Sequence, residues 1–255
     1  MVVEPLGNNI YVLRDDMLAG GTKSVLMPHI IGDANEYVYA TPVYGGFQIA
    51  LASYCKSIGK KATIFCAKRK VQHVNTLRCI ELGAKVIEVA HGYLSVVEKR
   101  ARDYCNASGA TKINWGAKTD RNRVLLAQRM MHVEKIMEFK FDEVWCAVGS
   151  GLLAESIVMG TTSANVYGVQ VGAEYKGTNF TNTYYRFKNE SLDINTFNKI
   201  QRLNILKYHK TFDKVSKYKA PFPSMPNYDL KAFEYCMVHQ ENKNPKTKVL
   251  FWNVL

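Results

Sequence analysis

The alternation of short apolar runs with helical patterns constrains the fold of this chain more than any other feature of its sequence. Before residue 172, runs with the length and composition of β-strands are separated by stretches with helical periodicity. Parallel strands need such helical crossovers, so this order predicts an α/β fold with a parallel sheet and helices on its faces. The expected strands are 10–14, 37–40, 62–66, 85–89, 112–114, 143–148 and 166–171, with a last strand at 248–254.

The helical patterns fill the stretches between these strands. They cover 46–57, 71–82, 95–104, 121–139 and 152–159. A further helix, capped by Asn227 or Asp229, is expected to end near residue 239. Two of the helices end in glycine just before a buried strand, a frequent joint in α/β folds.

The composition narrows the class of protein. The hydrophobic fraction of 47% and the charged fraction of 22% are those of an ordinary globular chain. No apolar run approaches the roughly 18 residues of a membrane span, and the first nine residues lack a signal-peptide pattern. The six cysteines are scattered without metal-finger spacing. We therefore expect a cytoplasmic protein without membrane contact, disulfide framework or metal site.

Positive charge is the one unusual bulk property. The formal net charge is +12, and residues 176–248 contain 14 Lys and Arg against 6 Asp and Glu. Basic surface attracts phosphate groups, and aromatic rings can stack on exposed bases. The segment 176–219 is therefore a candidate contact for nucleic acid or a nucleotide, although lysines on a solvated face and aromatic rings in the core explain the same pattern. The aromatic residues interleaved with the basic ones in 176–248 include Tyr184, Tyr185, Phe187, Phe197, Tyr208, Phe212, Tyr218 and Phe222.

A double glycine followed by a lysine forms the first candidate motif, Gly20-Gly21-Thr22-Lys23. Two adjacent glycines permit a tight turn and close approach of another group to the backbone. A lysine held beyond such a turn becomes a nucleophile if its surroundings lower its pKa, and can then form a Schiff base with a carbonyl. The alternative is a solvated lysine at the start of a helix.

A glycine loop after a strand forms the second motif, Gly149-Ser150-Gly151-Leu152. Backbone N–H groups at the start of a helix, together with the helix dipole, favour an anion such as a phosphate. The loop also fits a dinucleotide site, in which Glu174 would bind the ribose. A tight turn with close helix packing is the remaining alternative.

The third motif is the loop 40–48, which also joins a strand to a helix. Its free N–H groups could receive a carboxylate, and the Thr41 hydroxyl adds a donor. A plain strand-to-helix turn would have the same sequence.

In this order, the three motifs and the helix end at 57–61 resemble pyridoxal phosphate enzymes of the tryptophan-synthase-β type, also called fold type II. The likeness is strongest to the branch of 1-aminocyclopropane-1-carboxylate deaminase and D-cysteine desulfhydrase, and it covers 10–172 and 226–252. It implies a two-domain, three-layer parallel-sheet fold. The large cofactor-binding domain would comprise 1–34 plus 116–255 and the small domain 35–115, with the active site in the cleft.

The resemblance also implies the roles of the site residues. Lys23 would carry pyridoxal 5'-phosphate as an internal aldimine and later move a proton at Cα of the substrate. Gly46 stands where the family usually has an asparagine on the pyridine 3′ oxygen, so Tyr44 or Gln48 could take that contact. The implied cofactor-binding residues are Lys23, Gly149, Ser150, Gly151, Leu152, Tyr44 and Gly46, and the implied carboxylate-binding residues are Thr41, Tyr44, Gly45 and Gln48.

The expected activity is deamination, elimination or decarboxylation of an amino acid or amine, in a homodimer. Small members of such families occur in bacteriophages, some of which carry amino-acid groups on thymine, so an amino-acid-modified nucleotide or DNA base is a second substrate class. The alternatives are an NAD-type oxidoreductase that uses Gly149–Gly151, and a non-catalytic nucleic-acid-binding relative.

Overall fold

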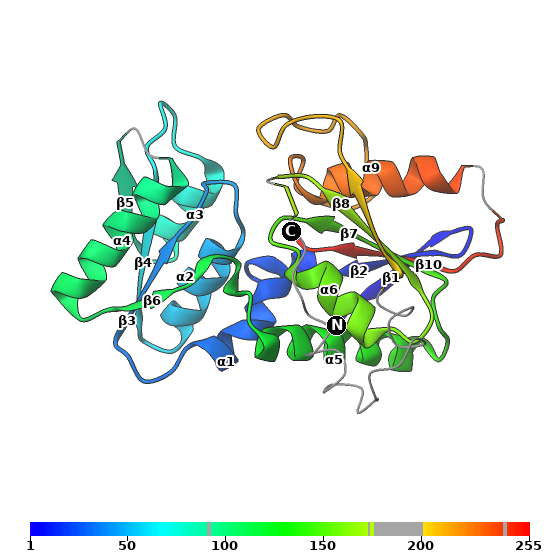
Figure 1. The fold of residues 1–255 in the computed structure, drawn as a ribbon, viewed down its shortest axis with the longest axis horizontal. Helices are drawn as coiled ribbons and strands as arrows, with labels where there is room; N and C mark the ends of the chain where they lie inside the picture. The colour runs from blue at the N-terminus through cyan, green and yellow to red at the C-terminus, as the bar shows by residue number, and fades with distance from the viewer. Residues whose placement is uncertain (91–92, 173, 176–200, 242–243) are drawn as a thin grey trace. The chain divides into compact units, whose positions relative to one another are not determined.

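The computed structural model describes residues 1–90, 93–172, 174–175, 201–241 and 244–255 (Figure 1). These residues group into two compact units: unit 1 contains Met1–Asp16 and Lys118–Leu255, and unit 2 contains Met17–Ala117. Unit 2 is thus one continuous stretch of chain, whereas unit 1 is built from the segments on either side of it.

Unit 1 is organised by a mixed sheet with the strand order β1-β2-β10-β7-β8-β9. Only the pair β1 and β2 is antiparallel, and the other neighbours are parallel. The carboxyl ends of the parallel strands therefore share one edge, where ligands bind in open α/β sheets. The strands are β1 Val3–Gly7, β2 Ile10–Arg14, β7 Glu143–Val148, β8 Asn165–Gln170, β9 Leu203–Lys207 and β10 Val249–Asn253.

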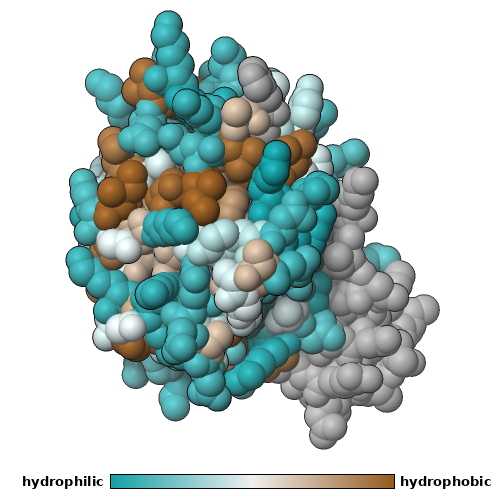
Figure 2. Space-filling model, turned by 90° about the vertical axis from the view of Figure 1, so that its left-hand side faces the viewer, coloured by the Kyte–Doolittle hydropathy of each residue, from teal (hydrophilic) through white to brown (hydrophobic). Residues whose placement is uncertain are grey.

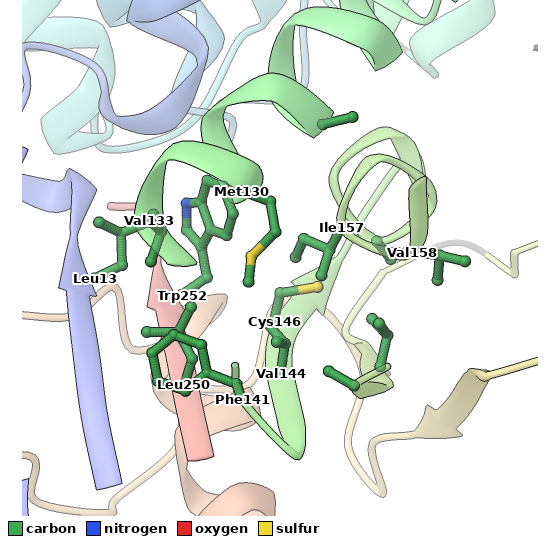
Figure 3. Close-up of a cluster of buried hydrophobic side chains, with 14 of the residues drawn as sticks. Leu13, Met130, Val133, Phe141, Val144, Cys146, Ile157, Val158, Leu250 and Trp252 are labelled. Carbon is green, nitrogen blue, oxygen red and sulfur yellow. The ribbon is translucent and has the colours of Figure 1, made fainter. Parts of the chain in front are cut away.

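Helices cover both faces of this sheet, because its central strands alternate apolar side chains between two cores. Helices α5 (Asp120–Met137) and α6 (Leu152–Gly160) lie on one face, and α9 (Asp229–Gln240) lies on the other (Figure 1). In β10, Leu250 and Trp252 point into the α5–α6 core, which Figure 3 shows, and Val249 and Phe251 point into the α9 core. Unit 1 is therefore a three-layer α/β unit.

Unit 2 repeats the arrangement with a smaller sheet, which is parallel throughout and has the order β5-β4-β3-β6. Tyr37 and Tyr39 of β3 pack toward α2 and α3, whereas Val38 and Ala40 pack toward α4. The strands are β3 Glu36–Ala40, β4 Lys61–Ala67, β5 Lys85–Val89 and β6 Thr111–Ile113. The helices are α1 Met27–Ile30, α2 Phe47–Ser57, α3 Val74–Glu81 and α4 Leu94–Ser108, with short 3-10 segments η2 Gly21–Leu26 and η3 Trp115–Ala117. A further 3-10 segment, η1 Asp15–Met17, spans the end of the first segment of unit 1 and the start of unit 2.

The predicted strands and helices are present within a few residues of their expected bounds, and the predicted α/β class is confirmed. Two strands were not predicted, namely β1 and β9. The hairpin of β1 and β2 turns at Asn8 and Asn9, both in the left-handed region with φ of 50° and 58°. The predicted cap of α9 was wrong: Tyr228 precedes the helix without a side-chain cap, and Asp229 is its first residue.

The boundary between the units differs from the expected division at residue 34. Residues 17–34 group with unit 2 because η2 packs against α2. A Cβ atom at Gly20 would lie 2.2 Å from the backbone nitrogen of Ala50, so these two segments touch backbone to backbone.

The surface shows two further features. Aliphatic side chains are exposed on and just before α3, at a spacing of three residues: Val71, Val74, Leu77 and Ile80. Figure 2 shows hydrophobic residues gathered among hydrophilic ones on the face it presents. Within the described parts of the chain, no helix combines the length and apolarity that crossing a bilayer requires.

Candidate functional site

The turn before Lys23 is held by glycine. Gly20 and Gly21 have φ of 87° and 75°, and η2 begins directly after Gly20. A side chain at Gly20 would collide with Ala50, which is why the turn can rest against α2. Lys23 therefore starts from a fixed backbone.

The Lys23 amine lies in a largely apolar environment. Its Nζ donates a hydrogen bond to the carbonyl of Gly116 at 3.1 Å and lies 5.6 Å from the centre of the Phe47 ring. Burial lowers the pKa of Lys23 from its ordinary value of 10.5 to about 8. Near neutral pH a useful fraction of the amine is uncharged, as a nucleophile requires.

The Gly116 carbonyl, which accepts the hydrogen bond from Lys23, is held in place by its neighbours. Gly116 has φ of 71°, and its N–H donates to the hydroxyl of Tyr39 at 3.3 Å. The Tyr39 ring packs on Phe47 with 4.4 Å between ring centres, and burial raises the pKa of Tyr39. Gly116, Tyr39 and Phe47 were not predicted as site residues, and their positions in the sequence give no local signal for this role.

The loop 41–46 is braced by its own side chains. Gln48 is fully buried and donates from Nε2 to the carbonyls of Val43 at 2.9 Å and Gly45 at 2.8 Å. Thr41, also buried, donates to the carbonyl of Pro42 at 2.9 Å. The donors of both side chains therefore support the loop, and the first-turn N–H groups of α2 are what the loop offers an anion.

The other predicted residues of this loop have distinct surroundings. Gly45 fits closely, because a Cβ there would lie 3.0 Å from the Thr41 hydroxyl oxygen, and Gly46 precedes α2. The Tyr44 ring packs edge-on against His73 at 4.9 Å, and the Arg69 guanidinium lies 5.7 Å from its centre. Contacts of Tyr44, Gly45 and Gly46 with a cofactor or a substrate remain predictions.

The second glycine loop connects β7 to α6 at the carboxyl edge of the unit 1 sheet. Gly151 has φ of 86°, and a Cβ there would lie 2.3 Å from the Tyr175 ring. A Cβ at Gly149 would lie 2.9 Å from the hydroxyl of Tyr228. Two tyrosines thus pack on the loop where only glycine fits. Leu152 is a core residue, so it offers a ligand only its backbone N–H.

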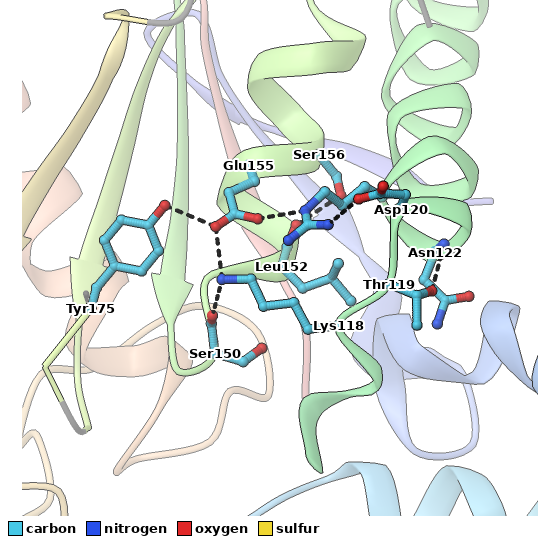
Figure 4. Close-up of polar contacts among 10 residues, drawn as sticks. Lys118, Thr119, Asp120, Asn122, Ser150, Leu152, Glu155, Ser156 and Tyr175 are labelled. Carbon is cyan, nitrogen blue, oxygen red and sulfur yellow. Dashed lines mark hydrogen bonds and ion pairs between the residues drawn. The ribbon is translucent and has the colours of Figure 1, made fainter. Parts of the chain in front are cut away.

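A buried ionic network lies directly behind this loop (Figure 4). Glu155, in the first turn of α6, is fully buried and accepts from Lys118 at 2.8 Å, from Arg123 at 2.7 Å and from the Tyr175 hydroxyl at 2.9 Å. Lys118 also donates to the carbonyl of Ser150 at 2.9 Å. The members of this network come from separate segments, so no local pattern in the sequence predicts it.

A buried carboxylic acid lies at the same sheet edge. Asp229 is fully buried at the start of α9, and its Oδ2 accepts the N–H of Leu255, just beyond β10, at 2.9 Å. Its Oδ1 has no hydrogen-bond partner among the residues that the structure covers. Burial raises the pKa of Asp229 well above its ordinary value of 3.8. Burial therefore disfavours the charged form of this carboxyl group.

The basic segment 176–219 is described only from residue 201 onward, so the aromatic residues at 184, 185, 187 and 197 lie outside the described residues. Exposed lysines in the described part are Lys207, Lys210, Lys214, Lys217 and Lys219. Tyr208 and Phe222, in contrast, are buried in the α9 core. These two rings cannot stack on bases, which corrects that part of the expectation.

Two further expectations concern other ligands. Glu174, the candidate ribose ligand, is exposed just beyond β8. In the part of the chain that the structure describes, no group of three or more His, Cys, Asp or Glu side chains could hold a metal ion.

Comparison with known proteins adds fold similarity. No family model and no curated protein sequence matches the chain. An ACC deaminase homologue has a TM-score of 0.78 at 17% identity, over 96% of this chain and 83% of the other. A hydrogen sulfide-producing enzyme from Fusobacterium nucleatum has a TM-score of 0.69 at 12% identity, over 99% and 93%. Threonine deaminase isoform 2 from Solanum lycopersicum has a TM-score of 0.64 at 15% identity, over 98% and 75%.

These similarities establish the fold. The chain folds like the deaminases, over nearly its whole length. The resemblance to fold type II is thereby confirmed for the architecture.

Proposed function

We propose that the protein is a pyridoxal phosphate-dependent enzyme of the lyase or deaminase kind, acting at Cα of an amino acid or amine. Its structural neighbours include an ACC deaminase homologue, threonine deaminase and diaminopropionate ammonia lyase, which are fold type II enzymes of this cofactor. The observation that carries the proposal is the Lys23 amine, whose pKa burial lowers to about 8 behind a double-glycine turn.

The residues present fit the cofactor. The loop Gly149–Gly151 leads into α6, whose first-turn backbone N–H groups favour an anion such as a phosphate. A Cβ at Gly149 or Gly151 would collide with Tyr228 or Tyr175, so only glycine fits at these two positions. Lys23 is a partly buried amine with a lowered pKa, which suits it to covalent attachment. Asp229 offers a buried oxygen with no partner among the described residues. When bound, pyridoxal phosphate supplies an electron sink for a carbanion at Cα.

In this proposal, each part of the chain has a defined task. The N–H groups at the start of α6 bind the phosphate, and those at the start of α2, in the loop braced by Gln48, bind and orient the substrate carboxylate. Nζ of Lys23 takes up and releases protons near neutral pH, because its pKa is about 8. Tyr175 and Tyr228 exclude water from the glycine loop on which they pack.

Asp229 is our candidate for the partner of the pyridine nitrogen. It adjoins Tyr228, whose hydroxyl lies against Gly149. Burial disfavours the charged carboxylate, and a protonated carboxyl group at this position can share its proton with a ring nitrogen. An Asp229→Asn variant tests the assignment, because it keeps the shape of the side chain and removes the titrating proton.

The spectrum of the purified protein tests the proposed function directly. Protein prepared with pyridoxal phosphate should absorb visible light, and borohydride reduction followed by peptide mapping should find the cofactor on Lys23. Lys23→Ala should remain colourless, while a variant of the exposed Lys56 should not. Reduction that fixed the cofactor to a different lysine would rule out Lys23 as its attachment site.

The oxidoreductase alternative makes a different prediction at the same loop. Calorimetry should show binding of pyridoxal phosphate and none of NAD or NADP. Tight NAD binding without pyridoxal phosphate binding would favour the alternative, with Glu174 as ribose ligand. Gly151→Asp should abolish binding of either, because it places a carboxylate at the anion site and a side chain in the Tyr175 ring.

We further propose that the substrate is borne on a nucleotide or DNA base. The exposed lysines from Lys207 to Lys219 support this proposal. Oligonucleotide affinity, measured by fluorescence anisotropy, should fall steeply between about 50 and 200 mM salt, because neutralised phosphates release counterions. No binding at low salt would leave a free amino acid or amine as the substrate. A bacteriophage origin, the cytoplasmic location and the homodimer remain predictions.

A further inference from the structure

We propose that Lys118 supplies a positive charge to the anion bound at Gly149–Gly151, and that Glu155 is the residue that positions it. This inference rests on the proposed function, since the anion is the cofactor phosphate. It assigns roles to two residues that belong to none of the three sequence motifs.

The position of the Lys118 amine is fixed from three sides. Its Nζ donates to the carbonyl of Ser150, within the glycine loop, at 2.9 Å and to Oε1 of Glu155 at 2.8 Å. The Tyr175 ring closes the third side, with its centre 5.3 Å away. Figure 4 shows the lysine reaching from its own segment to the loop. An ammonium group has three donors, so one remains that has no partner among the described residues.

Glu155 can hold this lysine because it is anchored elsewhere. Its Oε2 accepts from Nε of Arg123 at 2.7 Å, and its backbone N–H donates to the carbonyl of Gly151. The carboxylate is fully buried and cannot swing toward solvent. It therefore links the first turn of α6 to Lys118 through a short, directed contact.

The charges of this network favour an added anion. The buried carboxylate of Glu155 faces two cations, Lys118 and Arg123, whose side chains are 19% and 8% exposed. The second carboxylate on Arg123, that of Asp120, is 66% exposed, so water screens it. The buried part thus has a positive excess beside the amino end of α6, where the helix dipole adds to it.

The test compares two ligands that differ only in the phosphate, pyridoxal phosphate and pyridoxal. Lys118→Met should weaken pyridoxal phosphate about 10- to 100-fold, as expected for one charged hydrogen bond. It should change pyridoxal affinity little. Lys118→Arg should retain part of the affinity for pyridoxal phosphate that Lys118→Met loses. The stabilisation of the cofactor-free protein by inorganic phosphate, seen as a shift in Tm, should fall in parallel.

A matched control separates a positioning role from a structural one. Lys140 also pairs with a buried carboxylate of unit 1, Glu134 at 3.0 Å, and lies in a different segment. Lys140→Met should therefore lower stability without changing the ratio of the two affinities. Glu155→Gln in the wild-type background should reduce the ratio of the affinity for pyridoxal phosphate to the affinity for pyridoxal. Added to Lys118→Met in a double variant, it should not change this ratio further, because both substitutions act through the Lys118 amine.

The outcomes are distinguishable. If the wild type binds pyridoxal phosphate and Lys118→Met keeps the wild-type ratio, the inference is wrong and the proposed function stands. If the wild type binds neither pyridoxal phosphate nor inorganic phosphate, the inference about Lys118 and the proposed function are both wrong.

Discussion

Replacing Lys23 by methionine should stabilise the protein at neutral pH, since the lysine is held in surroundings that disfavour its charge. Methionine has similar length and no charge. Lowering the pKa from 10.5 to about 8 corresponds to about 3 kcal/mol, at about 1.4 kcal/mol for each pH unit. The lost hydrogen bond to Gly116 offsets about 1 kcal/mol. We therefore expect a gain of about 2 kcal/mol at pH 7.

The stability difference between the wild type and Lys23→Met should depend on pH. Below pH 8 the lysine is charged in both the folded and the unfolded protein, and the full cost of burying the charge is present. Between pH 8 and 10.5 the folded protein has lost the proton that the unfolded chain still binds, so wild-type stability rises relative to Lys23→Met. Above pH 10.5 both forms are neutral, and the advantage of methionine is gone.

Urea denaturation of the cofactor-free proteins between pH 7 and 10, followed by circular dichroism, measures the difference. Lys56→Met, at an exposed position in the same unit, is the control. It should show no such trend. A constant difference between wild type and Lys23→Met across this range would refute the claim that burial controls the Lys23 amine.

Two further predictions concern backbone and core. Gly20→Ala should lower the free energy of unfolding by more than about 2 kcal/mol, because a Cβ would meet the Ala50 backbone at 2.2 Å. Gly59→Ala, also at positive φ but in open space, should lower it by about 1 kcal/mol. Equal losses of stability in a urea titration would contradict the contact between Gly20 and Ala50. Trp252→Phe should cost about 2 to 3 kcal/mol, because it leaves a void and removes the indole donor 2.9 Å from the buried Asp15, and a Tm equal to that of the wild type would count against this packing.

The architecture could be predicted because each layer has a local sequence signal. The strands β4 and β7 are nearly continuous apolar runs, and glycine ends the helices between strands, so the alternation is visible residue by residue. The strand β1 was missed because Pro5 and Gly7 weaken its pattern, and an antiparallel edge strand tolerates both.

The site was predictable only where its signal is local. Gly20, Gly21 and Gly151 are visible in the sequence because their positive φ requires glycine. The partner of Lys23, in contrast, is the carbonyl of Gly116, which is 93 residues away. The acid that binds Lys118 is separated from it by two structural elements, α5 and β7. Such pairs depend on the tertiary fold, which propensity and periodicity do not encode.

The place of β10 in the unit 1 sheet sets an order of events during synthesis on the ribosome. β10 lies between β2 and β7, so the sheet lacks a central strand until residue 253 has been made. Unit 2 is continuous from Met17 to Ala117 and needs nothing that follows it to complete its own sheet. The nascent chain should therefore carry a folded unit 2 while β2, paired only with β1, and β7, paired only with β8, each lack the neighbour that β10 provides. Chaperones bind the apolar surface that such incomplete sheets expose.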